Sequence, residues 1–121
     1  MISFTIPLVP VTKKNSNQII LNKQTGKRQI IPSKKYREYE EACGYFVKGK
    51  GLKIAEPVTV RCLYFMPTKR RVDLVNLMEA THDILVKYEV LADDNSKIIY
   101  SVDGSRVLYD KDNPRTEVEI L

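Results

Sequence analysis

The segment VTVRCLYFM, at residues 58–66, constrains the fold of this chain more than any other. It consists mainly of β-branched and aromatic side chains, which are typical of a strand. Both of its alternating faces are apolar except at Arg61, whereas a strand with one face in water alternates apolar with polar side chains. We therefore predict that this segment is the central strand of a sheet.

The rest of the chain divides into shorter strands and two helices. Pro7 lies near the end of the first predicted strand, which indicates a sheet edge or a bulge. Gly26 marks the turn of a hairpin, and Ser33 is a suitable N-cap for the first helix. In chain order we predict a strand over 2–9, a hairpin over 17–32, a helix over 34–47, a helix beginning at Asp73, and strands near 97–102 and over 116–121.

These elements predict the fold class. Strands and helices mix in a pattern too compact for a wound parallel sheet. We therefore expect one α+β domain over residues 1–121, a mixed α/β arrangement in which a mixed sheet carries at least two helices. The first helix has one apolar stripe that is predicted to be buried, although tyrosines near lysines also stack on nucleotide bases. This stripe consists of Tyr36, Tyr39, Cys43 and Phe46.

The second helix has a polar stripe as well as an apolar face. Asp73 opens it, where unpaired backbone amides and the helix dipole stabilise a carboxylate. At about 100° per residue, the apolar and the polar side chains fall on nearly opposite sides of the helix. Acidic pairs one turn apart also occur on solvated helices without any role. The apolar face is Leu74, Leu77, Met78, Thr81, Ile84 and Leu85, and the polar stripe, nearly opposite, is Asn76, Glu79 and Asp83.

Charge is unevenly distributed along the chain, whose net charge is +5. Residues 1–55 hold 11 Lys or Arg against 3 Asp or Glu, whereas residues 56–121 hold 9 against 12. A basic half and an acidic half predict a polyanion bound on one side and a cation on the other, and nucleic acid with a divalent metal satisfies both. The alternative is that the asymmetry only aids solubility.

Several classes of protein are excluded. No apolar run approaches the roughly 20 residues of a membrane span, and the N-terminal segment lacks the features of a signal peptide, so we expect a cytoplasmic protein without membrane contact. No phosphate-binding glycine motif occurs, so no nucleotide cofactor is expected. Cys43 and Cys62 are predicted to be reduced core residues. The single histidine, His82, is predicted to be a surface or interface residue beside Val75 and Val86 rather than a general base.

Acidic residues gather around the second helix. Asp93 and Asp94 follow its predicted end in a tight return, so they are positioned to approach Asp73, Glu79 and Asp83. Three or more carboxylate oxygens, without a His or Cys set, are the ligands that Mg²⁺ or Mn²⁺ prefers. Such an ion activates a water molecule and offsets charge on a phosphodiester. We therefore predict a metal site on these carboxylates.

Positive charge lies directly beside these acids. Lys69, Arg70 and Arg71 precede the helix and are expected to hold the flanking phosphates of a nucleic acid. The alternative is that they neutralise the acids in weak surface salt bridges. The full set of predicted DNA contacts is Lys13, Lys14, Asn15, Lys27, Arg28, Lys69, Arg70 and Arg71.

The region resembles the RusA family of phage and prophage Holliday-junction resolvases. The family motif is a basic run, then D-L-D-N-L-x-K-A-x-x-D-A-L, a short gap and D-D, and this chain has KRR-VDLVNLMEATHDIL and LADDNSKII in the same order. The resemblance implies a homodimeric, Mg²⁺-dependent endonuclease that nicks four-way DNA junctions on two opposed strands in a bacterial host cell, as a phage or prophage protein. It places Asp73 and Asp94 at catalytic metal-ligand positions, with Asp93 beside the second.

Two positions depart from the motif. Val75 replaces the family's second aspartate, and Glu79 replaces its catalytic lysine. Either the protein is catalytically impaired and only binds branched DNA, or the site is rebuilt, because the longer Glu79 carboxylate is able to reach the space left one turn away at position 75. A metal nuclease without junction preference and a protein-interaction domain without DNA affinity also remain open. The leading catalytic candidates are Asp73, Glu79 and Asp94, with Arg70, Arg71 or Lys14 in place of the lysine.

Overall fold

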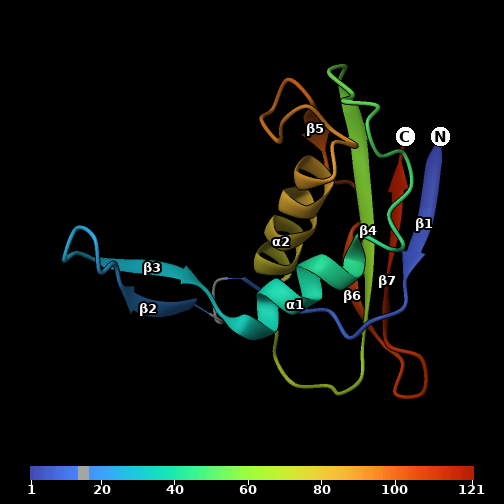
Figure 1. The fold of residues 1–121 in the computed structure, drawn as a ribbon. Helices are drawn as coiled ribbons and strands as arrows, with labels where there is room; N and C mark the ends of the chain where they lie inside the picture. Colours follow the sequence, from blue (N-terminus) through green and yellow to red (C-terminus); the bar gives the residue numbers. More distant parts are fainter. Residues whose placement is uncertain (14–16) are drawn as a thin grey trace.

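Strand β4 (Val58–Met66) lies in the middle of a five-stranded mixed sheet (Figure 1). On one side it pairs antiparallel with β7 (Arg115–Ile120), which pairs antiparallel with the edge strand β1 (Ile2–Ile6). On the other side it pairs parallel with β5 (Ile99–Ser101) and β6 (Arg106–Tyr109). The predicted central strand is thus confirmed. The computed structural model describes residues 1–13 and 17–121, without the side chains of residues 17–20 and 30.

Two helices pack against the sheet, which confirms the predicted α+β class (Figure 1). Helix α1 (Lys34–Cys43) begins at its N-cap Ser33, whose hydroxyl oxygen accepts a hydrogen bond from the Tyr36 amide at 3.2 Å. Helix α2 (Leu74–Lys87) begins at its N-cap Asp73. Both predicted caps are therefore correct.

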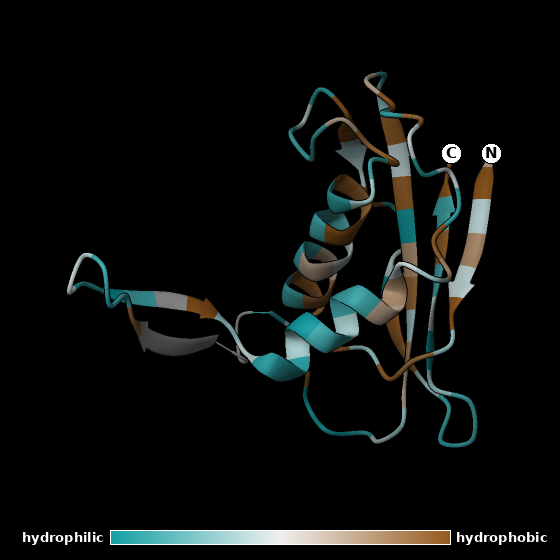
Figure 2. Cartoon of the chain, viewed as in Figure 1, coloured by the Kyte–Doolittle hydropathy of each residue, from teal (hydrophilic) through white to brown (hydrophobic). Residues whose placement is uncertain are grey.

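The core lies between the helices and one face of the sheet. Alternate side chains are buried along β7 and in the middle of β4, so one side of each strand faces the helices. The hydroxyls of Tyr64 on β4 and Thr81 on α2 are 2.7 Å apart and satisfy each other within this core. Figure 2 shows the apolar colouring along β1, β4 and the inner side of α2. The buried residues of the two helices are Tyr36, Tyr39, Cys43, Asn76, Leu77, Ala80, Thr81, Ile84 and Leu85.

Helix α1 ends earlier than predicted, at Cys43 rather than near residue 47. The Tyr88 hydroxyl donates to the carbonyl of Glu40 at 2.9 Å, which gives one of the last carbonyls of the helix a partner. The Tyr88 ring also lies so close to Gly44 that a Cβ there would be 2.5 Å from Cζ of the ring. Because the chain leaves the helix here, Phe46 is 37% exposed, and its predicted burial is wrong.

Other boundaries and one burial also differ from the predictions. The first strand ends at Ile6, just before Pro7, and β6 was not predicted. Asn76 was placed on the polar stripe of α2, but it is only 8% exposed. The burial of the Asn76 side chain shows that other parts of the molecule cover α2 beyond its apolar face.

Strands β2 (Asn17–Leu21) and β3 (Arg28–Pro32) form a separate antiparallel hairpin, as predicted. Gly26 adopts φ +70° in its turn, a conformation that favours glycine. The Asn22 side chain accepts hydrogen bonds from the amides of Gln24 and Thr25 at 3.0 and 3.3 Å. The hairpin projects from the body of the molecule as an arm (Figure 1).

The two cysteines are free and buried, as predicted. Burial raises the pKa of the Cys43 thiol to about 12 and that of Cys62 to about 11, so neither thiol is a nucleophile near neutral pH. Among the described residues, no helix is long and apolar enough to cross a bilayer.

Candidate active site

Asp73 lies at the start of α2 and is exposed. Its Oδ1 accepts hydrogen bonds from the amides of Val75 at 2.9 Å and Asn76 at 3.4 Å. One oxygen of the carboxylate therefore caps the helix, and the other makes no hydrogen bond to any described residue. Asp73 is thus fixed in place by the helix while it presents an oxygen to solvent.

The two other acids of the polar stripe have different surroundings. Glu79 is exposed and pairs with no cation in the described part of the chain. Asp83 is half-buried, and the Nζ of Lys13 lies 3.3 Å from its Oδ2. Asp83 therefore already has a cationic partner, whereas the carboxylate of Glu79 is available to a ligand.

The turn after α2 orients its two aspartates differently. Asp93 accepts hydrogen bonds from the Asp94 amide at 2.8 Å and from the Asn95 side chain at 3.1 Å. These donors hold the pKa of the Asp93 carboxyl below its usual value, so Asp93 mainly stabilises its own turn. The exposed Asp94 has no such bond to its side chain among the described residues.

His82 is more buried than predicted. Its Nε2 is inaccessible to solvent and has no hydrogen-bond partner among the described residues. Burial lowers the pKa of the imidazole, and the negative charges of Asp94 and Asp83 partly oppose that shift.

The candidate ligands do not form one cluster in the described residues. Asp73 is the N-cap of α2, Glu79 lies within the helix, and Asp94 lies in the turn beyond its end. No group of three or more His, Cys, Asp or Glu side chains in residues 1–13 and 17–121 is arranged to hold a metal ion within one copy of the chain. The open donors are carboxylate oxygens, which suit a hard cation. Asp73, Glu79 and Asp94 are the exposed candidate donors to such an ion.

The cation triplet Lys69–Arg71 lies in the loop between β4 and α2, and all three residues are exposed. None of them forms an ion pair with a carboxylate among the described residues. The alternative that they neutralise the neighbouring acids therefore lacks support here. The Lys69 Nζ lies 5.2 Å from the centre of the Tyr109 ring, which is itself 47% exposed. The triplet thus offers unpaired positive charge beside an aromatic surface.

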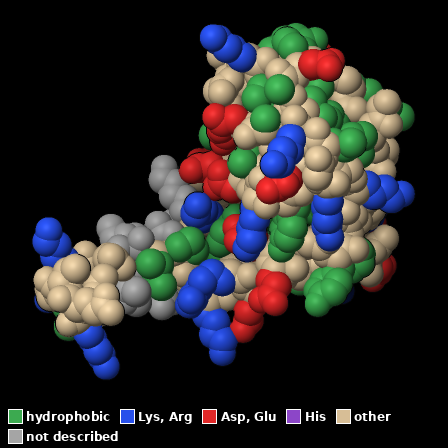
Figure 3. All heavy atoms as spheres, turned by 45° about the horizontal axis from the view of Figure 1, so that its top comes forward, with side chains coloured by type: hydrophobic (Ala, Val, Ile, Leu, Met, Phe, Trp, Pro, Cys, Tyr) green, Lys and Arg blue, Asp and Glu red, His purple; other side chains and the backbone are tan. Residues whose placement is uncertain are grey.

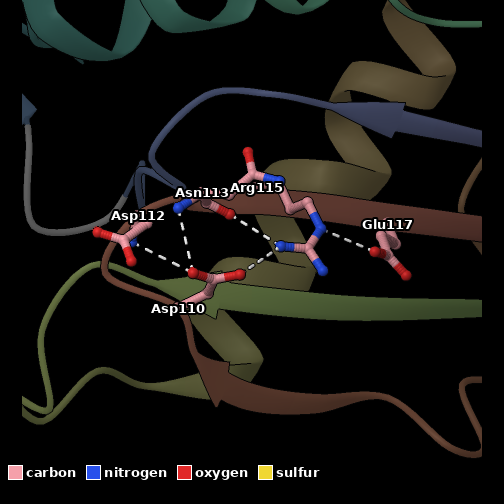
Figure 4. A network of polar contacts seen from close by, with 5 residues as sticks. All are labelled: Asp110, Asp112, Asn113, Arg115 and Glu117. Atoms are coloured by element: carbon pink, nitrogen blue, oxygen red, sulfur yellow. Dashed lines mark hydrogen bonds and ion pairs between the residues drawn. The ribbon is translucent and has the colours of Figure 1, made fainter.

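Arg115 fixes the turn that follows Tyr109 (Figure 4). Its guanidinium donates to Asp110 at 2.9 Å and to Glu117 at 2.8 Å, and it stacks 3.7 Å from the centre of the Phe65 ring. These bonds hold the pKa of Asp110 below its usual value. The network joins the ends of β4 and β6 to the start of β7. Tyr109, the last residue of β6, lies directly beside it.

Two of the remaining predicted DNA contacts lie on the arm. Lys27 and Arg28 are exposed at the end of the hairpin. Lys14 and Asn15 lie outside the described residues. Figure 3 shows acidic and basic side chains close together where the arm meets the body of the molecule. The Lys13–Asp83 pair and the Tyr109 surface were not predicted, because each joins residues that are far apart in the sequence.

Exposed carboxylates on α2 and the turn after it, together with cations that pair with no described carboxylate, suit a protein that binds a polyanion and a cation. The family model of endodeoxyribonuclease RusA matches residues 7–121, nearly the whole chain. The chain therefore belongs to the RusA family of endodeoxyribonucleases, and the resemblance seen in the sequence is confirmed. Comparison with curated proteins gave no match.

Proposed function

We propose that this protein is a Mg²⁺-dependent, structure-selective endodeoxyribonuclease that resolves four-way DNA junctions by paired nicks in DNA recombination and repair. The observation that carries the proposal is the family match over residues 7–121. One chain offers one set of candidate ligands, whereas two nicks on opposed strands need two sites. The active form is therefore a homodimer.

Each group of residues has a role in this proposal. Asp73, Glu79 and Asp94 hold Mg²⁺ or, as a substitute, Mn²⁺; a bound ion activates water and offsets the charge that develops on the phosphate. Lys69–Arg71 hold the phosphates that flank the cut. The arm, with Lys27 and Arg28 at its end, contacts a duplex further from the cut. Asp83 and Asp93 support the site, the first through Lys13 and the second through its turn.

The departures from the family motif favour a rebuilt site over an inactive one. Val75 is 64% exposed, so the position offers space but no ligand. Glu79, one turn further along, is exposed and without a cationic partner in the described part of the chain. It is thus able to return a carboxylate to that space. The second candidate is a protein that binds branched DNA without cutting it. Its only support is that Val75 cannot ligate a metal.

A junction assay tests the proposal. A synthetic four-way junction and a linear duplex of the same arm sequence are incubated with the protein in Mg²⁺, Mn²⁺ or EDTA. We expect symmetric nicks in the junction with either metal, none with EDTA, and an intact linear duplex. A junction that is bound but uncut in every lane supports the second candidate. Cutting of both substrates supports a nuclease without junction preference, and no salt-sensitive binding at all excludes both.

Replacing Glu79 with alanine tests the rebuilt site. We expect Glu79→Ala to lower the cleavage rate about tenfold or more, because an ion ligand is lost, without weakening junction binding. Single-turnover cleavage and a mobility-shift titration measure the two quantities. The matched control is Glu38→Ala, which removes an exposed glutamate from α1. Undiminished cutting by Glu79→Ala removes Glu79 from the site.

A further inference from the structure

Tyr109 has no role in the functions described so far. It is the last residue of β6, and it is 47% exposed. A single exposed tyrosine is common on a soluble protein and needs no explanation by itself. The place of this tyrosine in the sheet and the groups beside it, however, point to a function.

The register of β6 against β4 places Tyr109 on the same side of the sheet as α2. Val107 lies opposite Tyr64, whose hydroxyl bonds to that of Thr81 on α2. Register partners share a face of the sheet, and so do alternate residues of one strand, so Val107 and Tyr109 both face this side. Leu108, between them, lines a hollow on the opposite face. Tyr109 therefore faces the side of the sheet where α2 carries candidate metal ligands.

Tyr109 also lies beside the loop that carries the cation triplet. The Asp110 amide donates to the Met66 carbonyl at 2.9 Å, which holds the ends of β6 and β4 together where this loop begins. The Lys69 Nζ lies 5.2 Å from the centre of the Tyr109 ring. Lys69 precedes Asp73 by four residues, so their Cα atoms are at most about 14 Å apart. At about 3.4 Å per nucleotide of a strand, this distance spans only a few nucleotides.

The backbone that carries Tyr109 is held in a defined position. The next residue, Asp110, accepts hydrogen bonds from the Arg115 guanidinium and from the amides of Asp112 and Asn113 (Figure 4). A tyrosine side chain has only two rotatable angles, so a ring on a fixed backbone loses little conformational freedom when it binds. Tyr109 is thus a rigid aromatic group at the edge of a cationic surface.

We propose that Tyr109 stacks on a DNA base that is unstacked at the branch point of the junction, and so positions the neighbouring phosphate for cleavage. Aromatic side chains beside cations bind single-stranded DNA in this way, because every base has a π-face. The cation triplet holds the flanking phosphates, so base and backbone contacts come from one surface. This inference rests on the proposed function and adds a source of selectivity, because a linear duplex has no unstacked base.

Lys69 changes partner in this proposal. In the free protein its ammonium lies against the ring, and a cation–π contact at an exposed site is weak. A base stacked on the ring is a stronger partner, and a phosphate is a stronger partner for the ammonium. When DNA binds, the base therefore takes the ring while Lys69 moves to the phosphate.

Replacing Tyr109 tests the proposal through the ratio of junction affinity to duplex affinity. We expect Tyr109→Ala to weaken binding to a four-way junction about tenfold and to leave binding to a linear duplex unchanged. Tyr109→Phe keeps the ring and is expected to bind both substrates as the wild-type protein does. Arg70→Ala removes a phosphate contact instead and is expected to weaken both substrates alike. Mobility-shift titrations in EDTA measure the affinities of uncut DNA, and circular dichroism checks the fold.

Tyr100→Ala is the matched control. Tyr100 is 64% exposed on β5, which pairs with the start of β4, whereas β6 pairs with its end. Tyr100 is therefore an exposed tyrosine away from the cation triplet. We expect this variant to bind the junction with wild-type affinity.

A photocrosslink gives a readout that a purely structural role of Tyr109 would not change. Junctions carry 5-iodouracil at one position each, at the branch point or within about four nucleotides of it, and are irradiated in complex with the protein. We expect a crosslink from Tyr109 to a base at the branch point, identified by mass spectrometry of the linked peptide. Tyr109→Ala is expected to lose this crosslink.

Three results would each overturn the proposal. The first is a Tyr109→Phe variant as weak as Tyr109→Ala, because the hydroxyl and not the ring would then make the contact. The second is a Tyr109→Ala variant that binds the junction as tightly as the wild-type protein or loses affinity equally for both substrates. The third is the absence of a Tyr109 crosslink from every position. Paired nicks in the junction assay would leave the nuclease function standing in all three cases, whereas a protein that binds neither substrate, with or without Mg²⁺, would overturn both.

Discussion

Replacing Asp73 with asparagine is expected to stop junction cleavage while the fold and the DNA affinity remain. Asparagine caps a helix about as well as aspartate, so the hydrogen bonds from the Val75 and Asn76 amides are retained. The substitution removes the negative charge of a proposed metal ligand. We expect the single-turnover cleavage rate to fall about 100-fold or more, and junction affinity in a mobility-shift titration to change little.

Two further variants separate catalysis from capping. Asp112→Asn changes an exposed aspartate in the turn between β6 and β7 and is expected to cleave at the wild-type rate. Asp73→Ala loses the cap as well as the charge, so we expect an additional loss of about 1 kcal/mol of unfolding free energy. Wild-type cleavage by Asp73→Asn would show that Asp73 serves only as a helix cap.

Replacing Leu85 with alanine is expected to have the largest effect on stability. Leu85 is 0% exposed on the face of α2 that packs on the sheet. The substitution removes buried methyl groups and leaves a cavity, so we expect a loss of about 2–5 kcal/mol of unfolding free energy. Urea unfolding, followed by circular dichroism at one fixed protein concentration, measures the change; the concentration is fixed because any self-association would contribute to stability.

The matched control for this prediction is Leu21→Ala on the arm, where the leucine is 61% exposed. We expect this variant to stay within about 0.5 kcal/mol of the wild-type protein. If Leu85→Ala costs no more than Leu21→Ala, α2 does not depend on its buried face for its place on the sheet.

The predictions that succeeded depend on neighbouring residues. The caps at Ser33 and Asp73 and the hairpin turn at Gly26 each follow from groups within a few residues of one another. The central position of β4 follows from the composition of a single segment. The motif around Asp73 and Asp94 is equally local in its spacing, and the family match confirms what it implied about class.

The predictions that failed depend on contacts between distant segments. Helix α1 ends at Cys43, where Tyr88, which lies 45 positions further along, packs against Gly44 and donates to the Glu40 carbonyl. Asn76 is buried although helical periodicity places it on the polar side. The pair between Lys13 and Asp83 was not predicted, because the two residues are far apart in the sequence.

The sequence by itself determined the kinds of elements, the helix starts and the enzyme family, since caps, turns and strand composition act over short distances in the chain. Tertiary structure decided where α1 stops and, within the described part of the chain, which carboxylates remain unpaired. The physical reason is that burial and pairing depend on which groups meet in space. Asp73 and Asp83 have the same side chain on the same helix, yet the first keeps a free oxygen while the second faces a lysine 70 residues away.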